Sequence, residues 1–478
     1  MTAPTPVHAF ADDALGEDDA TAVAERLAAG EVSPLEVVEA SIARIEAVNP
    51  RLNAMAYRDF EAALARARKL RRPRGPFGGV PALAKENIHI KGMPMTMGSQ
   101  AMPTRLRSRD GGFTRQLLDT GLQLLGTTTM PAFGWTATTE RMGDDVTRNP
   151  WQTEYSSGGS SGGSAALVAA GAVPIAHGND GGGSIRIPAS VCGLVGLKAT
   201  RGRLRADPTT DTMPIKVVTD GVLARSVRDV ARFFEAAELT YRNSDLPAIG
   251  SVKDAPARRL RIGVTLDSPQ APVSDAPTRA TVQRTAELLA RLGHDVFEHE
   301  TKVPRSFRRD FEDYWSLLAF GMVAGGRRLF GEEFDTDRLD PLTVGLAKRA
   351  KRRMAKMPLV IARLAATAGA YEKSFKDVDV ILTPVLCHIT PHIGHLSADL
   401  TFGQHFERLV AYSGFTPWHN AAGGPAISVP AGATDKGLPI GVMFSAPRGD
   451  ERRLLEIAYE IEESAPFPRI QDLGPPVE

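Results

Sequence analysis

Short apolar runs alternate with longer amphipathic stretches along most of the chain. Ser33-Pro34-Leu35-Glu36 combines an N-cap serine, a proline suited to the first helical position and a glutamate that closes a capping box. It predicts a helix that runs to about Val48 and stops at Asn49-Pro50. Similar patterns predict further helices over residues Phe60–Leu70, Ser226–Leu239 and Ala276–Leu292.

Strands are predicted where a short apolar run lies between Gly or Pro residues. These runs are Val80–Ala84, Ala172–Ala176, Leu194–Leu197, Arg261–Val264, Val380–Leu382 and Ile427–Val429. Strands that alternate with helices favour an α/β fold whose sheet is largely covered on both faces. Residues 305–376 are predicted to be mostly helical, and no stretch is long enough to act as a linker between domains.

Composition and charge exclude several classes of protein. The 478 residues are 42% hydrophobic and 24% charged, which is ordinary for a folded protein and excludes a mostly disordered chain. The net charge of +1 provides no field that would hold nucleic acid or an anionic membrane. The basic run at residues 347–356 lies close to acidic residues at 332–340, so it is interpreted as a solvated helix face.

The cysteines and the N-terminus point to a cytoplasmic location. Cys192 and Cys387 are the only cysteines, so they form no disulfide framework. The first residues are acidic and lack the basic and apolar regions of a signal peptide. The longest nearly apolar run, Ala165–Ala176, is 12 residues long, which is too short to span a membrane.

Three segments differ from ordinary scaffold. In Gly79–Asn87 a single lysine, Lys85, follows an apolar strand. A lysine at the end of a strand usually extends to solvent, but burial would lower its pKa and make it a usable base. Ser156–Ser164 is rich in Gly and Ser and leads directly into an apolar helix, an arrangement that aims backbone N–H groups at negative charge. In Gly178–Pro188 three glycines precede Ser184, and such a run can form an oxyanion hole beside a nucleophile.

Together these segments resemble the amidase signature family of serine hydrolases. The family pattern GGSSGGS, apolar helix, strand, GxDxGGSIRxPA and GLxGxKPTxGR has its counterpart from Gly158 to Arg203. Gly79–Asn87 resembles the family's GVPxxxKDN, and Gly221–Asp229 and Gly424–Pro430 resemble two later blocks. The resemblance covers nearly the whole chain.

The resemblance implies one catalytic domain over residues 1–478, with a mixed, mainly parallel sheet between helical layers. Residues 1–75 would be its N-terminal helical part. Residues 305–376 would be a variable helical region that shapes the pocket.

The family's site residues can be placed position by position. The resemblance implies that Ser184 is the nucleophile, that Ser160 shuttles the proton and that Lys85 is the base. It also implies a cis peptide bond between Gly159 and Ser160. The N–H groups of Gly181, Gly182, Gly183 and of the nucleophile itself would form the oxyanion hole, with Ser161, Asp180 and Arg186 in support behind the site.

The implied activity is hydrolysis of a C–N bond in a small linear amide or carbamate through an acyl-enzyme, without cofactor or metal, by a monomer or homodimer. The segment around Ser184 looks most like 6-aminohexanoate cyclic-dimer hydrolases, and similar family members are urethanases. Residues expected to line the pocket are Phe133, Gly134, Trp135 and Arg203. Glu86 stands where the family has Asp, and Asn179 and Gly181 replace two threonines, which concerns substrate preference rather than chemistry.

Three alternatives are also compatible with the sequence. Gly158–Gly162 also fits the GxSxG elbow of α/β-hydrolase esterases, with Ser160 as nucleophile and His405 or His419 as partner. The cluster of Cys387, His388, His392 and His395 has residue types that bind metals. The chain also resembles the glutaminase subunit of tRNA-dependent amidotransferases, which needs a partner.

Overall fold

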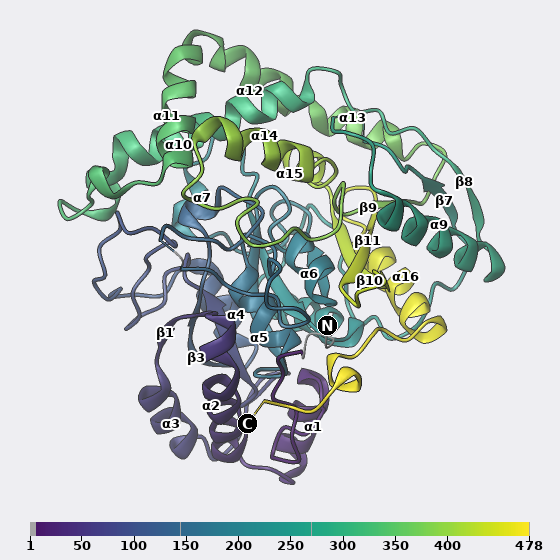
Figure 1. The fold of residues 1–478 in the computed structure, drawn as a ribbon. Coiled ribbons are helices and arrows are strands. Elements are labelled where there is room, and N and C mark those ends of the chain that lie inside the picture. Colours follow the sequence, from purple (N-terminus) through teal and green to yellow (C-terminus); the bar gives the residue numbers. More distant parts are fainter. Residues whose placement is uncertain (1–5, 144, 269, 478) are drawn as a thin grey trace.

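A mixed sheet runs through the centre of the molecule, and helices cover both of its faces (Figure 1). The computed structural model describes residues 6–143, 145–268 and 270–477. In this part of the chain the strand order is β1-β3-β2-β4-β6-β5-β10-β11-β9-β7-β8. The strands are β1 (Met55–Arg58), β2 (Pro81–Lys85), β3 (Gln123–Thr128), β4 (Ile175–Asp180), β5 (Val195–Lys198), β6 (Thr219–Ala224), β7 (Arg261–Val264), β8 (Asp295–Glu298), β9 (Val380–Pro384), β10 (Ala426–Ala433) and β11 (Pro439–Ser445).

Alternation along each strand assigns its side chains to two separate cores. In β11, Val442 and Phe444 join one hydrophobic cluster and Met443 joins the other. In β6, Val222 and Leu223 divide in the same way. This is the period of two expected for strands whose two faces are both buried.

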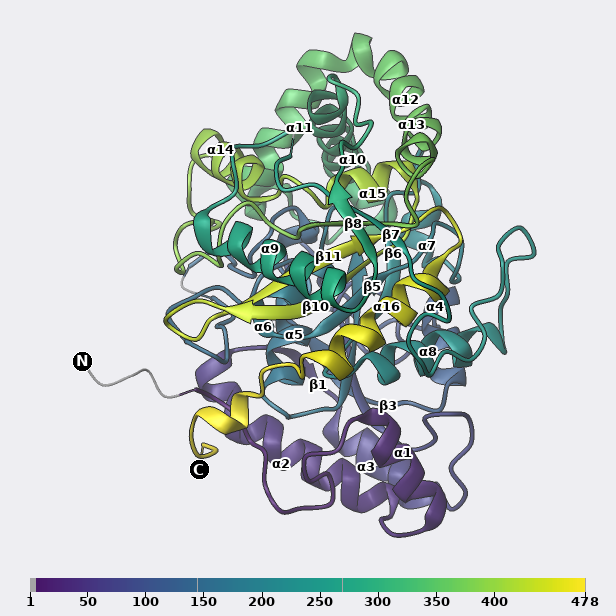
Figure 2. The ribbon, with the colours of Figure 1, turned by 90° about the vertical axis from the view of Figure 1, so that its right-hand side faces the viewer.

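The first face is covered by helices from both ends of the chain. Figure 2 looks onto this face, with α9 and α16 in front of β10 and β11. The helices that contribute to this core are α1 (Ala20–Ala29), α4 (Gly112–Asp119), α8 (Val227–Glu238), α9 (Ala276–Arg291) and α16 (Glu451–Ser464).

The second face is covered by α2 (Pro34–Leu52), α3 (Phe60–Lys69), α5 (Gly162–Ala169) and α6 (Arg186–Cys192). The short α5 and α6 are buried along their whole length, because they lie between the sheet and the outer helices. Helix α5 packs against β2, β4 and β6, while α6 packs against β5, β10 and β11. The two Gly-rich segments therefore lead into helices that the sheet fixes in place.

A helical layer closes one end of the sheet, at the top of Figure 1. It is built from aromatic and aliphatic side chains of α10 and of the segments that pack on it. Its elements are α10 (Phe307–Phe330), α11 (Pro341–Arg353), α12 (Met357–Ala365), α13 (Thr367–Ser374), α14 (Phe402–Tyr412) and α15 (Pro417–Ala422), with the single turn α7 (Pro208–Asp211) close by. Residues 305–376 are thus largely helical, as the sequence predicts.

The sheet is mixed, as expected, but the expectation that it is mainly parallel is wrong. Parallel pairing is confined to two groups, β3-β2-β4 and β9-β7-β8. The centre from β4 through β6, β5, β10 and β11 to β9 is antiparallel. For β10 and β11 the physical reason is the connection between them, which is only five residues long and returns the chain in the opposite direction as a hairpin.

The capped helix begins as predicted and ends later than predicted. Ser33 accepts a hydrogen bond from the Glu36 N–H, and the Glu36 carboxylate accepts one from the Ser33 N–H, so the capping box is complete. The helix then continues through Pro50 to Leu52. The Asn49 side chain accepts hydrogen bonds from the N–H groups of the two residues that follow Asn53, which secures the end of the helix beyond the proline.

No helix in the described part of the chain combines the length and the apolar character needed to cross a membrane.

Candidate active site

Three segments of the chain meet beside the ends of the neighbouring parallel strands β2 and β4. Lys85 is the last residue of β2, and residues 181–184 follow directly on β4. Ser160 and Ser161 come immediately before α5, which packs against both strands. Because parallel strands end at the same edge of a sheet, the fold brings the three predicted segments together.

The Lys85 side chain is fully buried, and three polar atoms lie within hydrogen-bonding distance of its Nζ atom. Ser160 Oγ lies at 2.8 Å and Ser161 Oγ at 3.0 Å. The third atom, Asn179 Oδ1, lies at 2.7 Å. The structure thus places the predicted lysine against the first predicted serine.

Burial lowers the pKa of Lys85 to about 7, because the ammonium loses its hydration inside the protein. The negative charges of Asp180, Asp220 and Glu86 act in the opposite direction and favour the charged form. The balance leaves a substantial fraction of this lysine neutral near pH 7, which is the condition for a lysine to accept a proton.

A buried pair behind Lys85 fixes the backbone that carries it. His177 Nδ1 accepts a hydrogen bond from the Lys85 backbone N–H at 3.2 Å. His177 Nε2 lies 3.1 Å from Asp220 Oδ1. Because these residues come from β4, β2 and β6, the pair ties the three strands together next to the lysine.

The Gly159–Ser160 peptide bond is cis, as the resemblance implies. A Cβ atom at residue 159 would lie 2.6 Å from the Thr138 carbonyl oxygen and 2.8 Å from the Ala137 carbonyl carbon. Glycine is therefore needed at this position, because only a residue without a side chain lets the Ser160 loop pass so close to this backbone.

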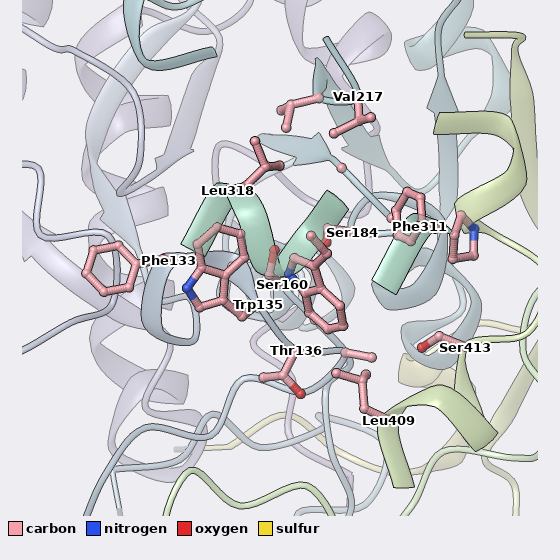
Figure 3. Close-up of a pocket in the computed structure, with 18 of the residues that line it drawn as sticks. Phe133, Trp135, Thr136, Ser160, Ser184, Val217, Phe311, Leu318, Leu409 and Ser413 are labelled. Carbon is pink, nitrogen blue, oxygen red and sulfur yellow. The ribbon is translucent and has the colours of Figure 1, made fainter. Parts of the chain in front are cut away.

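Ser184 and Ser160 line the same cavity, and Figure 3 shows both among the lining residues. In the described part of the chain, no hydrogen bond joins the two hydroxyl groups. The structure therefore brings Lys85 and Ser160 into contact and places Ser184 on the same surface.

The glycines before Ser184 divide into two kinds. Gly181 and Gly182 line the cavity. The Gly183 N–H instead donates to Asp180 Oδ1 at 2.7 Å, so it is not free for an oxyanion, which corrects the expectation for this residue. Among the described residues, none accepts a hydrogen bond from the backbone N–H groups of Gly181, Gly182 or Ser184.

A buried ion pair shapes this segment from behind. Arg186 Nη2 lies 2.8 Å from Asp180 Oδ1, and Arg186 Nε lies 2.9 Å from Asp180 Oδ2. Burial alone would raise the pKa of Asp180, but the Arg186 guanidinium holds it well below its usual range. The Asn420 side chain joins both partners, since it donates to Asp180 Oδ1 at 2.9 Å and accepts from Arg186 at 2.7 Å.

The cavity has a volume of about 190 Å³, which is more than ten times the space one water molecule needs. Its walls combine a loop near the serines with the helical layer, and Figure 3 shows aromatic rings from both sides. Phe133, Gly134 and Trp135 line it, as do residues of α10 that include Phe311, Tyr314, Trp315 and Leu318. Part of the predicted variable region thus forms one wall.

Comparison with known proteins agrees with this arrangement. A family model described as Amidase matches residues 36–455. The chain is 46% identical to "Putative amidase AmiC" of Mycobacterium leprae over 466 residues, which covers 97% of this chain and 99% of that protein. It is 36% identical to the 6-aminohexanoate-cyclic-dimer hydrolase of Paenarthrobacter ureafaciens over 482 residues, 94% of this chain and 95% of that protein.

The chain belongs to the amidase family. A solved structure of 6-aminohexanoate cyclic dimer hydrolase complexed with substrate superposes with a TM-score of 0.86. That match has 34% identity and covers 96% of this chain and 99% of the other. The predicted resemblance to the amidase signature family and the predicted α/β fold with one amidase-signature domain are therefore confirmed.

One predicted lining residue of this amidase-family protein lies elsewhere. Arg203 is buried away from the cavity, with its Nη2 atom 2.6 Å from Glu451 Oε2 and its Nη1 atom 3.2 Å from Glu238 Oε1. Two carboxylates and two backbone carbonyls satisfy this guanidinium, so it has no group left for a ligand. The GxKxTxGR block that carries it therefore has a structural place next to α16 and α8.

Among the described residues, the histidines that the esterase alternative requires form hydrogen bonds with side chains other than Ser160. His405 Nε2 lies 2.8 Å from Thr136 Oγ1, and His419 Nδ1 lies 3.2 Å from Arg186 Nη1. Burial lowers the pKa of both rings, that of His405 to about 4. Within the described residues 145–159 no strand leads into Ser160, whereas the nucleophile elbow of an α/β hydrolase requires one.

The Cys387, His388, His392 and His395 cluster, considered as an alternative metal site, does not assemble into one in the part of the chain that the structure describes. The His388 and His395 rings lie 5.9 Å apart, and the His392 ring stacks on Tyr155. Within residues 6–143, 145–268 and 270–477, no group of three or more His, Cys, Asp or Glu side chains is arranged to hold a metal ion.

Sequence reasoning missed several residues around the site of this amidase-family member. Asn179 was noted only as a replacement for threonine, yet it contacts the Lys85 amine. Asn420 is not singled out by the sequence, and His419 is named only as a possible partner of Ser160. Both lie more than 230 positions from Arg186 and contact it in the fold. For Asn179, its position one residue before the end of β4 and just ahead of the three glycines was a usable signal, whereas distance in sequence hid the contacts of the other two.

Proposed function

We propose that this member of the amidase family hydrolyses C–N bonds of small, uncharged amides or carbamates through an acyl-enzyme on Ser184. The observation that carries the proposal is the buried Lys85 amine in contact with Ser160, on the cavity that Ser184 lines. A serine hydroxyl is a weak nucleophile and needs a neighbouring base, and a lysine acts as one only when it is neutral.

The proposed reaction moves one proton along the three residues. Ser184 Oγ attacks the substrate carbonyl and gives its proton to Ser160, which passes a proton to Lys85 Nζ. The N–H groups of Gly181, Gly182 and Ser184 stabilise the oxyanion. The proton returns through Ser160 to the leaving nitrogen, the C–N bond breaks, and an amine departs.

Water then hydrolyses the acyl-enzyme by the same relay and releases the acid. With a carbamate, the intermediate is a carbonate ester of Ser184. Its hydrolysis releases an unstable half-ester of carbonic acid, which decomposes to an alcohol and CO₂.

The charges around the cavity favour uncharged substrates. Arg308 and Glu312 line the cavity but pair with each other at 3.0 Å. Glu312 also pairs with Arg349 at 3.1 Å. The remaining described walls are mostly aromatic and aliphatic, so a charged acyl group would be desolvated there without a partner.

The proposal is tested with a panel of substrates and by intact-protein mass. We expect turnover of butyryl-4-nitroanilide, and rates at least about 10-fold lower for succinyl-4-nitroanilide, because its carboxylate would enter an apolar cavity unpaired. An aliphatic amide and an aryl carbamate in the panel decide the preferred leaving group. A rapid quench should reveal a mass increase equal to one acyl group, absent in Ser184→Ala.

Two outcomes would contradict the proposal. One is turnover of the panel without any dependence on Ser184. The other is inactivity on the whole panel combined with ammonia release from glutamine only when an amidotransferase partner is added, which would support the glutaminase alternative.

The pH dependence follows from the lysine. Because burial lowers the pKa of Lys85 to about 7, we expect kcat/KM to rise with pH through about 7 and then to level off. The sign follows from the requirement for the neutral amine, which is depleted below its pKa. Stopped-flow or plate-reader rates with the nitroanilide between pH 5 and 9 provide the measurement, and a rate that is flat over this range would exclude Lys85 as the base.

A further inference from the structure

The number of polar atoms around the Lys85 amine equals the number of N–H groups and lone pairs that the amine carries. A neutral amine carries two N–H groups and one lone pair, whereas the ammonium carries three N–H groups. Three polar atoms lie within 3.0 Å of Nζ, on Ser160, Ser161 and Asn179. The chemistry of these three atoms decides where the lone pair points.

Two of the three neighbours act as acceptors. Asn179 Oδ1 is a carbonyl oxygen and has no proton to donate. The Ser161 hydroxyl donates its proton to the Asn179 backbone carbonyl at 3.3 Å, so toward Lys85 its oxygen accepts. Both N–H groups of the neutral amine are therefore used, and the lone pair is left for the Ser160 hydroxyl proton.

The orientation of the Asn179 amide is consistent with this assignment. Asn179 lines the cavity, and none of the described residues accepts a hydrogen bond from its Nδ2 atom. The amide therefore turns its oxygen to the lysine, and its NH₂ group finds no acceptor among the described residues.

We propose that Asn179 is a positioning residue that fixes the lone pair of neutral Lys85 on the Ser160 hydroxyl proton. The inference rests on the proposed function and deepens it. When the Ser160 proton moves to Nζ, the new N–H points back at Ser160 Oγ while the other two keep their acceptors. The transfer then needs no rearrangement of heavy atoms, which is the preorganisation that a fast proton relay requires.

Asparagine suits this position better than threonine, which the family pattern has here. A threonine hydroxyl both donates and accepts, so it is able to donate to the lysine lone pair and compete with Ser160. The carboxamide oxygen cannot do so. The replacement at residue 179 thus has a consequence for the base itself, beyond the substrate preference inferred from the sequence alone.

The charged and polar groups around Lys85 come from three strands. Asp180 and the His177 ring lie on β4, Asp220 on β6, and Glu86 directly after β2. Burial raises the pKa of Glu86 to about 7, so Glu86 titrates in the same range as the lysine. Residue 179 contacts Lys85 directly. A shift of the pH-profile midpoint that is caused by a substitution at residue 179 is therefore attributed to Lys85 and not to Glu86.

The test compares pH profiles of kcat/KM on butyryl-4-nitroanilide for Asn179→Leu, Asn179→Asp and Asn179→Thr. In Asn179→Leu we expect a plateau about 10- to 100-fold below wild type and a lower midpoint, because the ammonium loses one acceptor. In Asn179→Asp the new carboxylate stabilises the ammonium, so the midpoint should rise by about one pH unit or more. Asn179→Thr keeps an acceptor and should recover to within about 10-fold of wild type.

A matched control carries the same change of charge at a distance. Asn243 lies on a partly exposed loop, and its side chain forms hydrogen bonds with backbone groups only. The Asn243→Asp substitution should therefore leave the midpoint of the pH profile unchanged. Asn179→Asp has nearly the same shape as the native residue, so the test survives if Asn179→Leu does not fold.

The inference is overturned if both the leucine and the aspartate variants keep the wild-type midpoint, with rates that only follow the amount of folded protein. That outcome would leave the proposed function intact as long as Ser184→Ala and Lys85→Met are inactive. Activity retained in those two variants would instead refute the proposed function.

Discussion

Replacement of Ser184 by alanine is expected to lower kcat/KM for the preferred substrate by about 10⁴-fold or more. The variant loses the atom that forms the acyl-enzyme, while the backbone N–H groups around the cavity stay in place. Lys85→Met should lose a similar amount, because the Ser160 hydroxyl then has no base to receive its proton. Initial rates with the nitroanilide, at equal concentrations of folded protein, provide the comparison.

The double variant makes this prediction sharper. Residues that act as one relay do not contribute independently, so Ser184→Ala combined with Lys85→Met should lose no more than either single variant. A suitable control is Ser428→Ala on β10. It removes another buried hydroxyl group outside the cavity, and the oxygen of this hydroxyl has no hydrogen-bond partner among the described residues. Its activity should stay at the wild-type level.

Lys85→Met should also fold well. The native ammonium is desolvated in the interior, and methionine has a similar length without a charge. We expect its melting temperature to be equal to or above that of wild type. The serine relay would be contradicted if Ser184→Ala kept a tenth or more of the activity while Ser160→Ala lost it entirely, since that pattern belongs to a nucleophile at residue 160.

The sequence predicts the site of this amidase-family protein better than it predicts the sheet. Lys85, Ser160 and Ser184 lie in short motifs whose local chemistry is unusual, and the fold places all three at one cavity or in direct contact with it. Strand β6 was missed because Asp220 and Gly221 are typical of turns. Its Asp220 is tolerated inside a strand because His177 from the neighbouring strand pairs with it.

The same reasoning applies to β11, which begins with Pro439 and contains Gly441. A single sequence offers no sign that Gly441 lies against α6, where a side chain would meet Ser190 at 2.8 Å. Long-range partners also decided the place of Arg203, which the motif placed near substrate and which two glutamates hold elsewhere. A short motif predicts the chemistry of its own residues. The pairing between distant segments depends on contacts that cannot be predicted from one sequence.

The second large effect concerns stability and comes from Arg186. The Asp180–Arg186 pair is fully buried, so removing only the cation leaves a carboxylate in the interior without its counter-charge. We expect Arg186→Met to lower the free energy of unfolding by about 3–5 kcal/mol at pH 7. Urea denaturation followed by circular dichroism measures the loss. Arg228→Met is the matched control, because the Arg228 side chain is half exposed and its pair with Asp19 should be worth less than about 1 kcal/mol.

The pH dependence of this loss identifies its cause. In wild type the pKa of Asp180 lies well below its usual value, so the contribution of the pair is complete at pH 7 and at pH 5. In Arg186→Met burial should raise the pKa of Asp180, and protonation then relieves the unpaired charge as the pH falls. The difference in stability between variant and wild type should therefore shrink from pH 7 to pH 5, and Asp180→Asn should recover part of it in the double variant. A loss that is equal at both pH values would mean that it comes from the lost packing of the Arg186 side chain, and not from the unpaired Asp180 carboxylate. The Gly183 N–H, which donates to Asp180, would then be held in place by the backbone alone.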